Sequence, residues 1–237
     1  MILSPVISRV PDSLQLKASG FKWKCRRYAR RDSCRCLAWQ APWRAASDKP
    51  TTPWRVRGLR GQDVLEVAAA ADLQATCFHE PPPLGFLKTW SLYLFRADVI
   101  SIITAKLKYT TKDEFKCLVV PAQDPSKGFV GIIELSKLSD EKVLRAIPEP
   151  APDYLCYLAC MAVDARLRRQ GIATALLAAA QVQAAKWRMK WMALDVFADN
   201  ATALACYEAC GFKIIRRDEP MRRLIGQRLR VTMAKPV

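Results

Sequence analysis

Apolar residues along residues 54–237 follow the two spacings that separate helices from strands. Segments 62–78 and 85–108 have the helical spacing of three and four residues, and Pro81-Pro82-Pro83 interrupts them. A third helix is predicted over 174–187 from its Ala, Leu and Gln content. Apolar runs of strand length are predicted as strands at 54–59, 115–121, 129–135, 157–163, 194–197 and 228–234.

The order of these elements predicts the fold class. A turn with Asp124, Pro125 and Gly128 makes 115–121 and 129–135 a hairpin, and a loop is expected after Ser139-Asp140-Glu141. A strand and two helices come first, then antiparallel strands, then strand, helix, strand, helix and strand. We therefore predict an α/β domain with a mixed central β-sheet flanked by helices, and expect the aromatic stripe of 85–108 in its core.

Positive charge is concentrated at the start of the chain. Residues 1–60 hold fourteen Lys and Arg against three Asp, a net of +11 out of +16 for the chain. This basic, serine-containing stretch has no apolar run long enough to cross a bilayer, and is typical of an organelle transit peptide. We predict that residues 1–50 are such a disordered leader and that the folded domain is 54–237. The alternative is a nucleic-acid-binding arm, because Trp23, Tyr28 and Trp39 interleave with the basic residues.

Nine cysteines accompany a single histidine, His79. No C-x-x-C pair occurs, so the spacing favours reduced thiols over a zinc site, and no metal is predicted. We expect His79, which precedes the proline run, to cap or pack rather than to bind metal.

The join between strand 157–163 and helix 174–187 is a candidate anion site. The first N–H groups of a helix have no partner within the helix, and with the helix dipole they attract phosphate or pyrophosphate. Gly171 lets a ligand approach the backbone closely, and Arg168 and Arg169 add positive charge.

Two motifs give the chain a family resemblance. Residues 168–173 match the Q/R-x-x-G-x-G/A signature of the GNAT acetyltransferase superfamily, and Asn200, Ala203, Tyr207, Gly211 and Phe212 match its N-x-x-A-x-x-x-Y-x-x-x-G-F pattern. The sequences at 78–81 and 166–173 look most like the plant chloroplast branch, which includes enzymes active on both N-termini and lysines. The resemblance implies the GNAT fold, with central strands that splay apart to admit the pantetheine arm of acetyl-CoA.

The resemblance also implies a set of site residues. Tyr207 matches the proton-donating tyrosine, and Asn200 is expected to bond the cofactor arm or to cap its helix. Glu134 is a tentative general base, the alternative being a surface or ion-paired carboxylate. The residues expected to bind acetyl-CoA are Met161, Ala162, Val163, Arg168, Arg169, Gln170, Gly171, Ile172, Ala173, Thr174, Asn200, Ala201, Thr202 and Tyr207.

These expectations combine into one functional prediction. The protein would transfer acetyl groups from acetyl-CoA to protein or peptide amines, at N-termini, lysine side chains or both, by direct transfer in the chloroplast stroma. A small-amine acetyltransferase acting on serotonin or polyamines, and a nucleic-acid-binding module that uses the basic N-terminus, are the alternatives. No membrane association is predicted, nucleic acid is the less favoured partner, and the sequence carries no signal for the oligomeric state.

Overall fold

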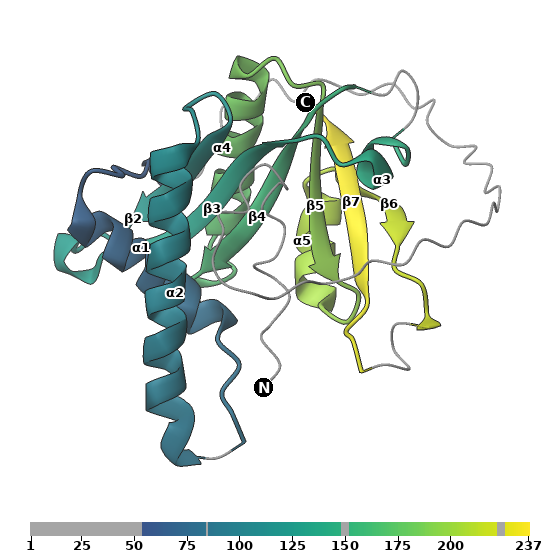
Figure 1. Ribbon diagram of the computed structural model, residues 1–237. Coiled ribbons are helices and arrows are strands. Elements are labelled where there is room, and N and C mark those ends of the chain that lie inside the picture. The colour runs from purple at the N-terminus through teal and green to yellow at the C-terminus, as the bar shows by residue number, and fades with distance from the viewer. Residues whose placement is uncertain (1–53, 84, 148–151, 222–225) are drawn as a thin grey trace. The chain divides into compact units, whose positions relative to one another are not determined.

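A computed structural model describes residues 54–83, 85–147, 152–221 and 226–237 (Figure 1). Its centre is a seven-stranded sheet in the order β1-β2-β3-β4-β5-β7-β6. Only β4 and β5 pair in parallel, and every other neighbouring pair of described strands is antiparallel, so the predicted mixed sheet is confirmed. The strands are β1 (Arg57–Gly58), β2 (Phe115–Pro121), β3 (Phe129–Leu138), β4 (Leu155–Val163), β5 (Trp191–Phe197), β6 (Lys213–Arg217) and β7 (Arg230–Pro236).

Helices cover both faces of the sheet (Figure 1). Gly131 of β3 lies against α4, where an added Cβ would come within 2.6 Å of Ile172, whereas Glu134 of the same strand contacts α1 and α2 on the opposite face. The α-helices are α1 (Val64–Phe78), α2 (Lys88–Tyr109), α3 (Glu141–Leu144), α4 (Ile172–Lys186) and α5 (Ala201–Ala209), and the 3-10 turns are η3 (Gly85–Leu87), η4 (Pro125–Lys127) and η5 (Ala165–Leu167).

The main hydrophobic core lies between the sheet and the helices α4 and α5. Its fully buried members include Leu176 of α4, Met192 and Leu194 of β5, and Met233 of β7. Tyr207 of α5 belongs to the same cluster. The helix that carries the predicted proton donor is therefore held against β5 and β7 by apolar packing.

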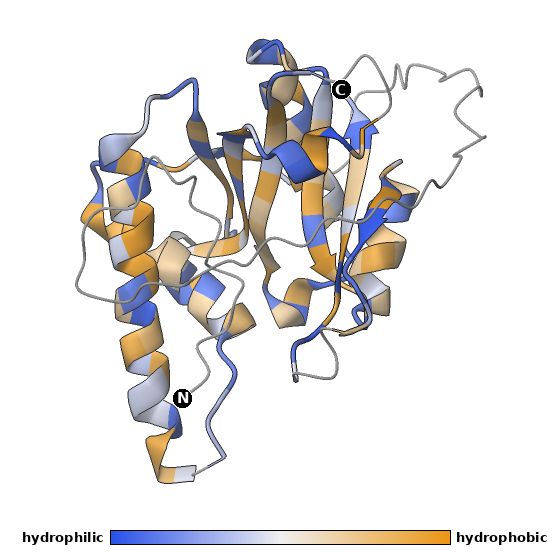
Figure 2. Ribbon diagram, turned by 45° about the vertical axis from the view of Figure 1, so that its right-hand side comes forward, coloured by the Kyte–Doolittle hydropathy of each residue, from blue (hydrophilic) through white to orange (hydrophobic). Residues whose placement is uncertain are grey.

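Two local predictions were wrong. The segment after Asp140 is the short helix α3 rather than a loop, because the Asp140 carboxylate accepts hydrogen bonds from the N–H groups of Lys142 and Val143. Hydrophobic residues run along much of α2 (Figure 2), but Trp90 and Tyr93 are 62% and 64% exposed rather than in the core. The N-terminal half of α2 thus presents aromatic side chains to solvent.

The central strands part from each other, as predicted. Parallel pairing between β4 and β5 covers only 156–158 and 192–194, although β4 continues to Val163 and β5 to Phe197. Within β4, one residue more than in β3 lies between the flanking pairs, and Cys160 takes a positive φ of 50° there. Such a bulge bends its strand and turns β4 away from β5.

Some predictions concern residues outside this description. The proposed leader, residues 1–50, lies outside the described residues. Among the residues that are described, no helix is both long and apolar enough to cross a bilayer.

Candidate functional site

The loop from β4 to α4 has the geometry of an anion site. Gly171 is the N-cap of α4 with φ 82° and ψ 3°, a left-handed conformation that favours glycine. Since glycine has no side chain, no side-chain group caps the helix, and the first-turn N–H groups of Ile172, Ala173 and Thr174 are left for another acceptor. Arg169 also has a positive φ, of 65°. Two left-handed residues thus flank Gln170, and successive residues with such conformations are typical of loops whose backbone N–H groups bind anions.

Side chains fix this loop from both ends. The indole N–H of Trp54 donates to the Gln170 carbonyl at 2.6 Å, which ties the first described residue to the loop. Arg168 turns back, and its Nε donates to the Val163 carbonyl at 3.5 Å. Arg169 is exposed beside the N-terminus of α4. Of the two arginines, Arg169 is therefore the one placed to add charge for an anion.

The edge of β4 that faces β5 is available along its C-terminal part. Met161, Ala162 and Val163 lie beyond the last pair with β5, and Ala162 and Val163 pair with Ile132 and Gly131 of β3 on the other side. Their β5-side backbone groups match an extended ligand that carries amide groups, which could pair with them as a strand would.

The start of α5 lies at the same end of the sheet, after β5. Asn200 is the N-cap, and its side-chain oxygen accepts from the Ala203 N–H at 3.1 Å. The capping alternative for Asn200 is confirmed, and the side-chain NH₂ group takes no part in this bond. Ala201 and Thr202 form the exposed first turn beside it.

Tyr207 lies one and a half turns further along α5. Its side chain is 9% exposed, and its ring meets that of Phe212 edge to face, with centroids 5.9 Å apart. Burial, with the neighbouring Cys206 and Cys210, raises the pKa of Tyr207 above its usual value of 10. The hydroxyl is therefore protonated at neutral pH, as a proton donor must be.

Glu134 is 1% exposed and ion-paired. Lys106 of α2 donates to one carboxylate oxygen at 2.6 Å, and Gln74 of α1 donates to the other at 2.8 Å. Burial, the largest single effect, acts to lower the pKa of Lys106, but the charge and hydrogen bond of Glu134, together with the nearby Cys160 and Cys117, raise it overall. The structure thus shows the ion-paired form that was the alternative to a base, and a base role for Glu134 stays a prediction.

A second carboxylate lies at the parting of the strands. The last pair between β4 and β5 is Leu158 with Leu194, and Asp195 is the next residue of β5. Thr232 of β7 donates to Asp195 Oδ1 at 2.6 Å and accepts from Arg216 Nη2 of β6 at 3.2 Å. Sequence analysis did not select Asp195, although the alternation in Leu194-Asp195-Val196 was a signal that it faces away from the core of α4 and α5.

Strand register aligns Asp195 with Glu134. Glu134 pairs with Ala159 of β4, the residue after the last pair with β5, so Ala159 and Asp195 are the first residues on either side of the parting. Both carboxylates lie on the face of the sheet that α1 covers. Across the strands, Ala159 of β4 lies between Glu134 of β3 and Asp195 of β5, and its side chain is small. This face therefore presents Asp195 beside the open strands, while Glu134 is enclosed beneath α1 and α2.

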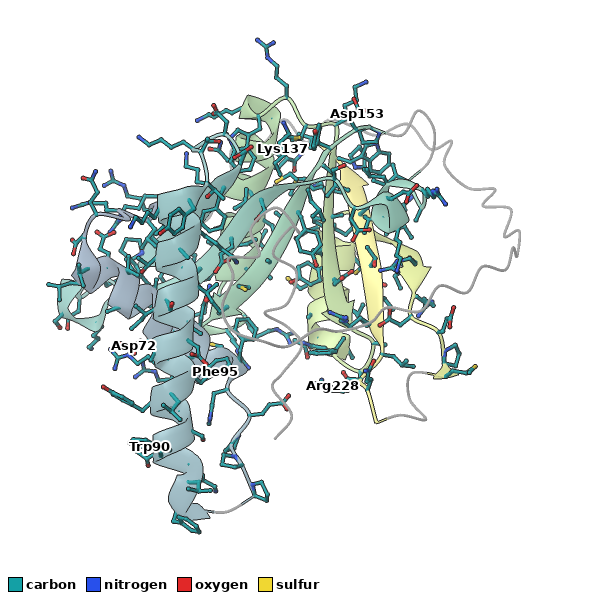
Figure 3. The ribbon with its side chains drawn as sticks, in the orientation of Figure 1. Asp72, Trp90, Phe95, Lys137, Asp153 and Arg228 are labelled. Atoms are coloured by element: carbon teal, nitrogen blue, oxygen red, sulfur yellow. The ribbon has the colours of Figure 1, made fainter. Side chains whose placement is uncertain are left out.

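Arg228 (Figure 3) lies before β7 and contacts residues of two loops, the one after α1 and the one after β5. It donates to both carboxylate oxygens of Asp199, at 2.8 and 3.2 Å, and to Glu80 at 3.3 Å. Its guanidinium group lies 3.9 Å from the ring centroid of Phe197, the last residue of β5. The loops after α1 and β5 and the segment before β7 thus meet at one cation.

His79 both caps and packs, as predicted. Its backbone N–H closes α1 on the Ala75 carbonyl, its Nε2 lies 2.9 Å from Ser91 Oγ, and its ring contacts that of Phe95 at 5.7 Å. The part of the chain that the structure describes contains no group of three or more His, Cys, Asp or Glu residues arranged to hold a metal ion.

Comparison with known proteins gives consistent matches. The family model described as "Acetyltransferase (GNAT) family" matches residues 72–212. GCN5-related N-acetyltransferase 10, chloroplastic, of Arabidopsis thaliana is 31% identical over 188 residues, which cover 77% of this chain and 72% of that protein.

Solved structures share the fold at low sequence identity. PH1933 from Pyrococcus horikoshii is 17% identical with a TM-score of 0.57, and the match covers 78% of this chain and 98% of that one. A chain of the NatC complex bound to Gag peptide and CoA is 16% identical with a TM-score of 0.51, over the same shares of the two chains. PaiA N-acetyltransferase from Thermoplasma acidophilum, in complex with coenzyme A, is 14% identical with a TM-score of 0.50 and coverage of 78% and 100%.

Proposed function

The chain belongs to the GNAT acetyltransferase family, as its motifs predicted, and on that basis we propose that it acetylates amines of proteins or peptides. The transfer of acetyl from acetyl-CoA to an amine follows from the family, whereas the protein substrate is our proposal. The parting of β4 from β5 directly before the loop at Gly171 supports the transfer itself, and the peptide bound in the NatC structure supports the choice of a protein or peptide amine. A thioester can enter between the strands from one face, and an amine can meet it from the other.

The residues present fit acetyl-CoA. The pyrophosphate suits the first N–H groups of α4 beside Arg169, where Gly171 contributes no side chain to block it. The amides of the pantetheine arm suit the β5-side edge of Met161 to Val163. Acetyl-CoA supplies the activated acetyl group when it is bound, and this protein's own residues supply position and proton transfer.

Opposite faces of β5 support separate roles for an acid and a base. Leu194 and Val196 point into the core cluster that contains Tyr207, so Asp195 between them points to the face covered by α1. We therefore assign proton donation to Tyr207 and proton acceptance from the amine to Asp195. Glu134 is the alternative acceptor predicted from sequence, but its oxygens are already bound by Lys106 and Gln74.

The proton balance of the transfer is as follows. Asp195 takes one proton from the substrate ammonium, and the neutral nitrogen forms a bond to the acetyl carbon. The nitrogen loses a second proton to water while the carbon–sulfur bond breaks, and sulfur leaves with the bonding electrons and takes the proton of Tyr207. Tyr207 regains a proton from solvent and Asp195 releases its own, so one net proton is released per acetyl group.

The same proposal includes location. The chloroplastic relative and the basic, acid-poor residues 1–50 support a transit peptide and a mature domain of 54–237 in the stroma. The peptide bound in the NatC structure supports peptide substrates for a chain of this fold.

A product analysis tests this function. The purified protein is incubated with acetyl-CoA and a peptide library that contains free N-termini and internal lysines, and mass spectrometry locates each acetyl group. We expect acetylated peptides, and the ratio of α-amine to ε-amine products gives the preference. Acetylation of spermidine or serotonin with none of the peptides would contradict the protein substrate and favour the small-amine alternative.

Paired variants separate the two proposed bases. Asp195→Asn removes the carboxylate at the parting and keeps its shape, and Glu134→Gln does the same beneath α1 and α2. We expect Asp195→Asn to lower kcat/KM about 10²-fold or more for a lysine peptide. A loss of this size in Glu134→Gln, with kcat/KM left intact in Asp195→Asn, would transfer the base role to Glu134.

A further inference from the structure

Two thiols lie next to each other on α5. Cys206 and Cys210 are one turn apart, on either side of Tyr207 along the sequence, and both side chains are half-buried. The Cys210 N–H donates to the Cys206 carbonyl at 3.1 Å, so the two residues follow each other along one face of the helix. The two side chains are therefore neighbours on the helix surface in the reduced protein.

The surroundings of Cys210 favour its thiolate. The Cys206 hydrogen bond lowers the pKa of Cys210 to about 7 against the opposing effect of burial, helped by the charge of Lys235 and a hydrogen bond from Thr174. Lys235 Nζ is held nearby, 3.0 Å from the Cys210 carbonyl and 2.9 Å from Gln181 Oε1. The groups that face this thiol thus come from α5 itself, from α4 and from β7.

Other cysteines in the described parts of the chain have the opposite environment. Burial raises the pKa values of Cys156 and Cys160 to about 12, and it also raises those of Cys77 and Cys117. Because the thiolate is the reactive form, an oxidant at neutral pH would select Cys210 among the cysteines of the described residues.

The C-terminal end of α5 can move enough to bring the two cysteines within disulfide distance. Side chains one turn apart on a helix have Cβ atoms about 5–6 Å apart, whereas a disulfide needs about 3.5–4.5 Å. Cys210 follows the last helical residue, Ala209, and precedes Gly211 with its left-handed φ of 87°, so the chain after the helix can turn. Phe212 is anchored in the core, so the adjustment falls on the last turn of α5, which contains Tyr207.

We propose that Cys206 and Cys210 form a reversible disulfide that displaces Tyr207 and lowers acetyl transfer. With a peroxide as oxidant, the Cys210 thiolate attacks an oxygen atom, the O–O bond breaks, and Cys210 becomes a sulfenic acid. The Cys206 thiol then attacks that sulfur and water leaves, so two thiols and one hydrogen peroxide give one disulfide and two waters. A dithiol reductant reverses the change by thiol–disulfide exchange.

The test uses the full chain with hydrogen peroxide added in steps to one equivalent. We expect the intact mass to fall by about 2 Da, the mass of two hydrogen atoms, and peptide mapping to link Cys206 to Cys210. Turnover should fall at least about tenfold, in line with the loss of a general acid, and dithiothreitol should restore it. Cys206→Ser and Cys210→Ser should each keep most of their turnover under the same treatment, whereas Cys77→Ser, the matched half-buried control, should lose it as the wild type does.

The expected loss of turnover rests on the proposed function, but the disulfide itself can be tested separately. The linked peptide is measured without any activity assay, so a reduced protein with no acetyl transfer would refute the function alone. Oxidation that links other cysteines, or that leaves Cys210 as a sulfinic acid with Cys206 free, would overturn the disulfide. A complete Cys206–Cys210 link with unchanged turnover would overturn the control of Tyr207.

Discussion

Replacing Lys106 by methionine tests whether the buried ion pair is a structural unit. Methionine keeps the length and much of the packing of lysine but removes the positive charge beside Glu134, which is 1% exposed, and leaves the hydrogen bond from Gln74. Breaking a buried pair by removing one partner costs about 3–5 kcal/mol. The remaining bond and the 17% exposure of the Lys106 side chain favour the lower end, about 3 kcal/mol.

Urea and thermal unfolding of the full chain measure this loss. For a domain of this size, about 3 kcal/mol corresponds to roughly 6–12 °C in the melting temperature. The matched control is Lys108→Met, an exposed lysine two residues further along α2, which should change stability by less than about 0.5 kcal/mol. Adding Glu134→Leu to Lys106→Met should recover at least half of the loss, since no unpaired charge then remains.

The pH dependence follows from the raised pKa of Lys106. A lysine whose folded pKa lies above its unfolded value stabilises the fold fully below the unfolded pKa of about 10.4, and this contribution is lost as the pH rises through the folded value. The stability gap between wild type and Lys106→Met should therefore be constant from pH 7 to about 10 and shrink above that. If Lys106→Met unfolds at the same urea concentration as Lys108→Met, the pair is not what holds Glu134 in place.

Three further outcomes are expected. Tyr207→Phe keeps the ring against Phe212 but removes the donor, so kcat should fall about 10²–10⁴-fold with little change in acetyl-CoA affinity, and a drop under fivefold would make the ring structural. Gly171→Ala forces a side chain into a φ of 82°, so unfolding should show a loss of about 1–2 kcal/mol in stability. Calorimetric titration of the same variant should show weaker acetyl-CoA binding. The control Gly85→Ala, whose Cβ meets nothing within 4 Å, should show neither change. N-terminal sequencing of the protein from plastids should begin near residue 50, and recovery of Met1 in most molecules would remove the transit peptide.

The motifs could be placed on the fold because each is local. The glycine before α4 and the asparagine before α5 act through backbone geometry within a few residues, and both are helix N-caps in the structure. The hairpin and the order of elements follow from period and turn chemistry. These features need no knowledge of distant contacts.

What sequence analysis missed depends on register between strands far apart in the chain. The enclosure of Glu134 comes from Lys106 and Gln74 on two earlier helices, 28 and 60 residues away. The position of Asp195 beside Ala159 follows from where parallel pairing stops, at Leu158, just before the bulge at Cys160. A positive φ at a cysteine has no sequence signature, so the parting could be expected only from the family resemblance.

The bond between Trp54 and Gln170 would limit where the proposed leader can be cleaved. Its donor is the first described residue after the basic leader, and its acceptor carbonyl belongs to the turn that would hold the pyrophosphate, 116 positions later. Cleavage before Trp54 would keep this hydrogen bond. Cleavage a few residues after Trp54 would remove the donor and leave the turn at Gln170 without it. If the proposed leader is removed, the position of that cut would therefore affect the affinity for acetyl-CoA through the indole of Trp54.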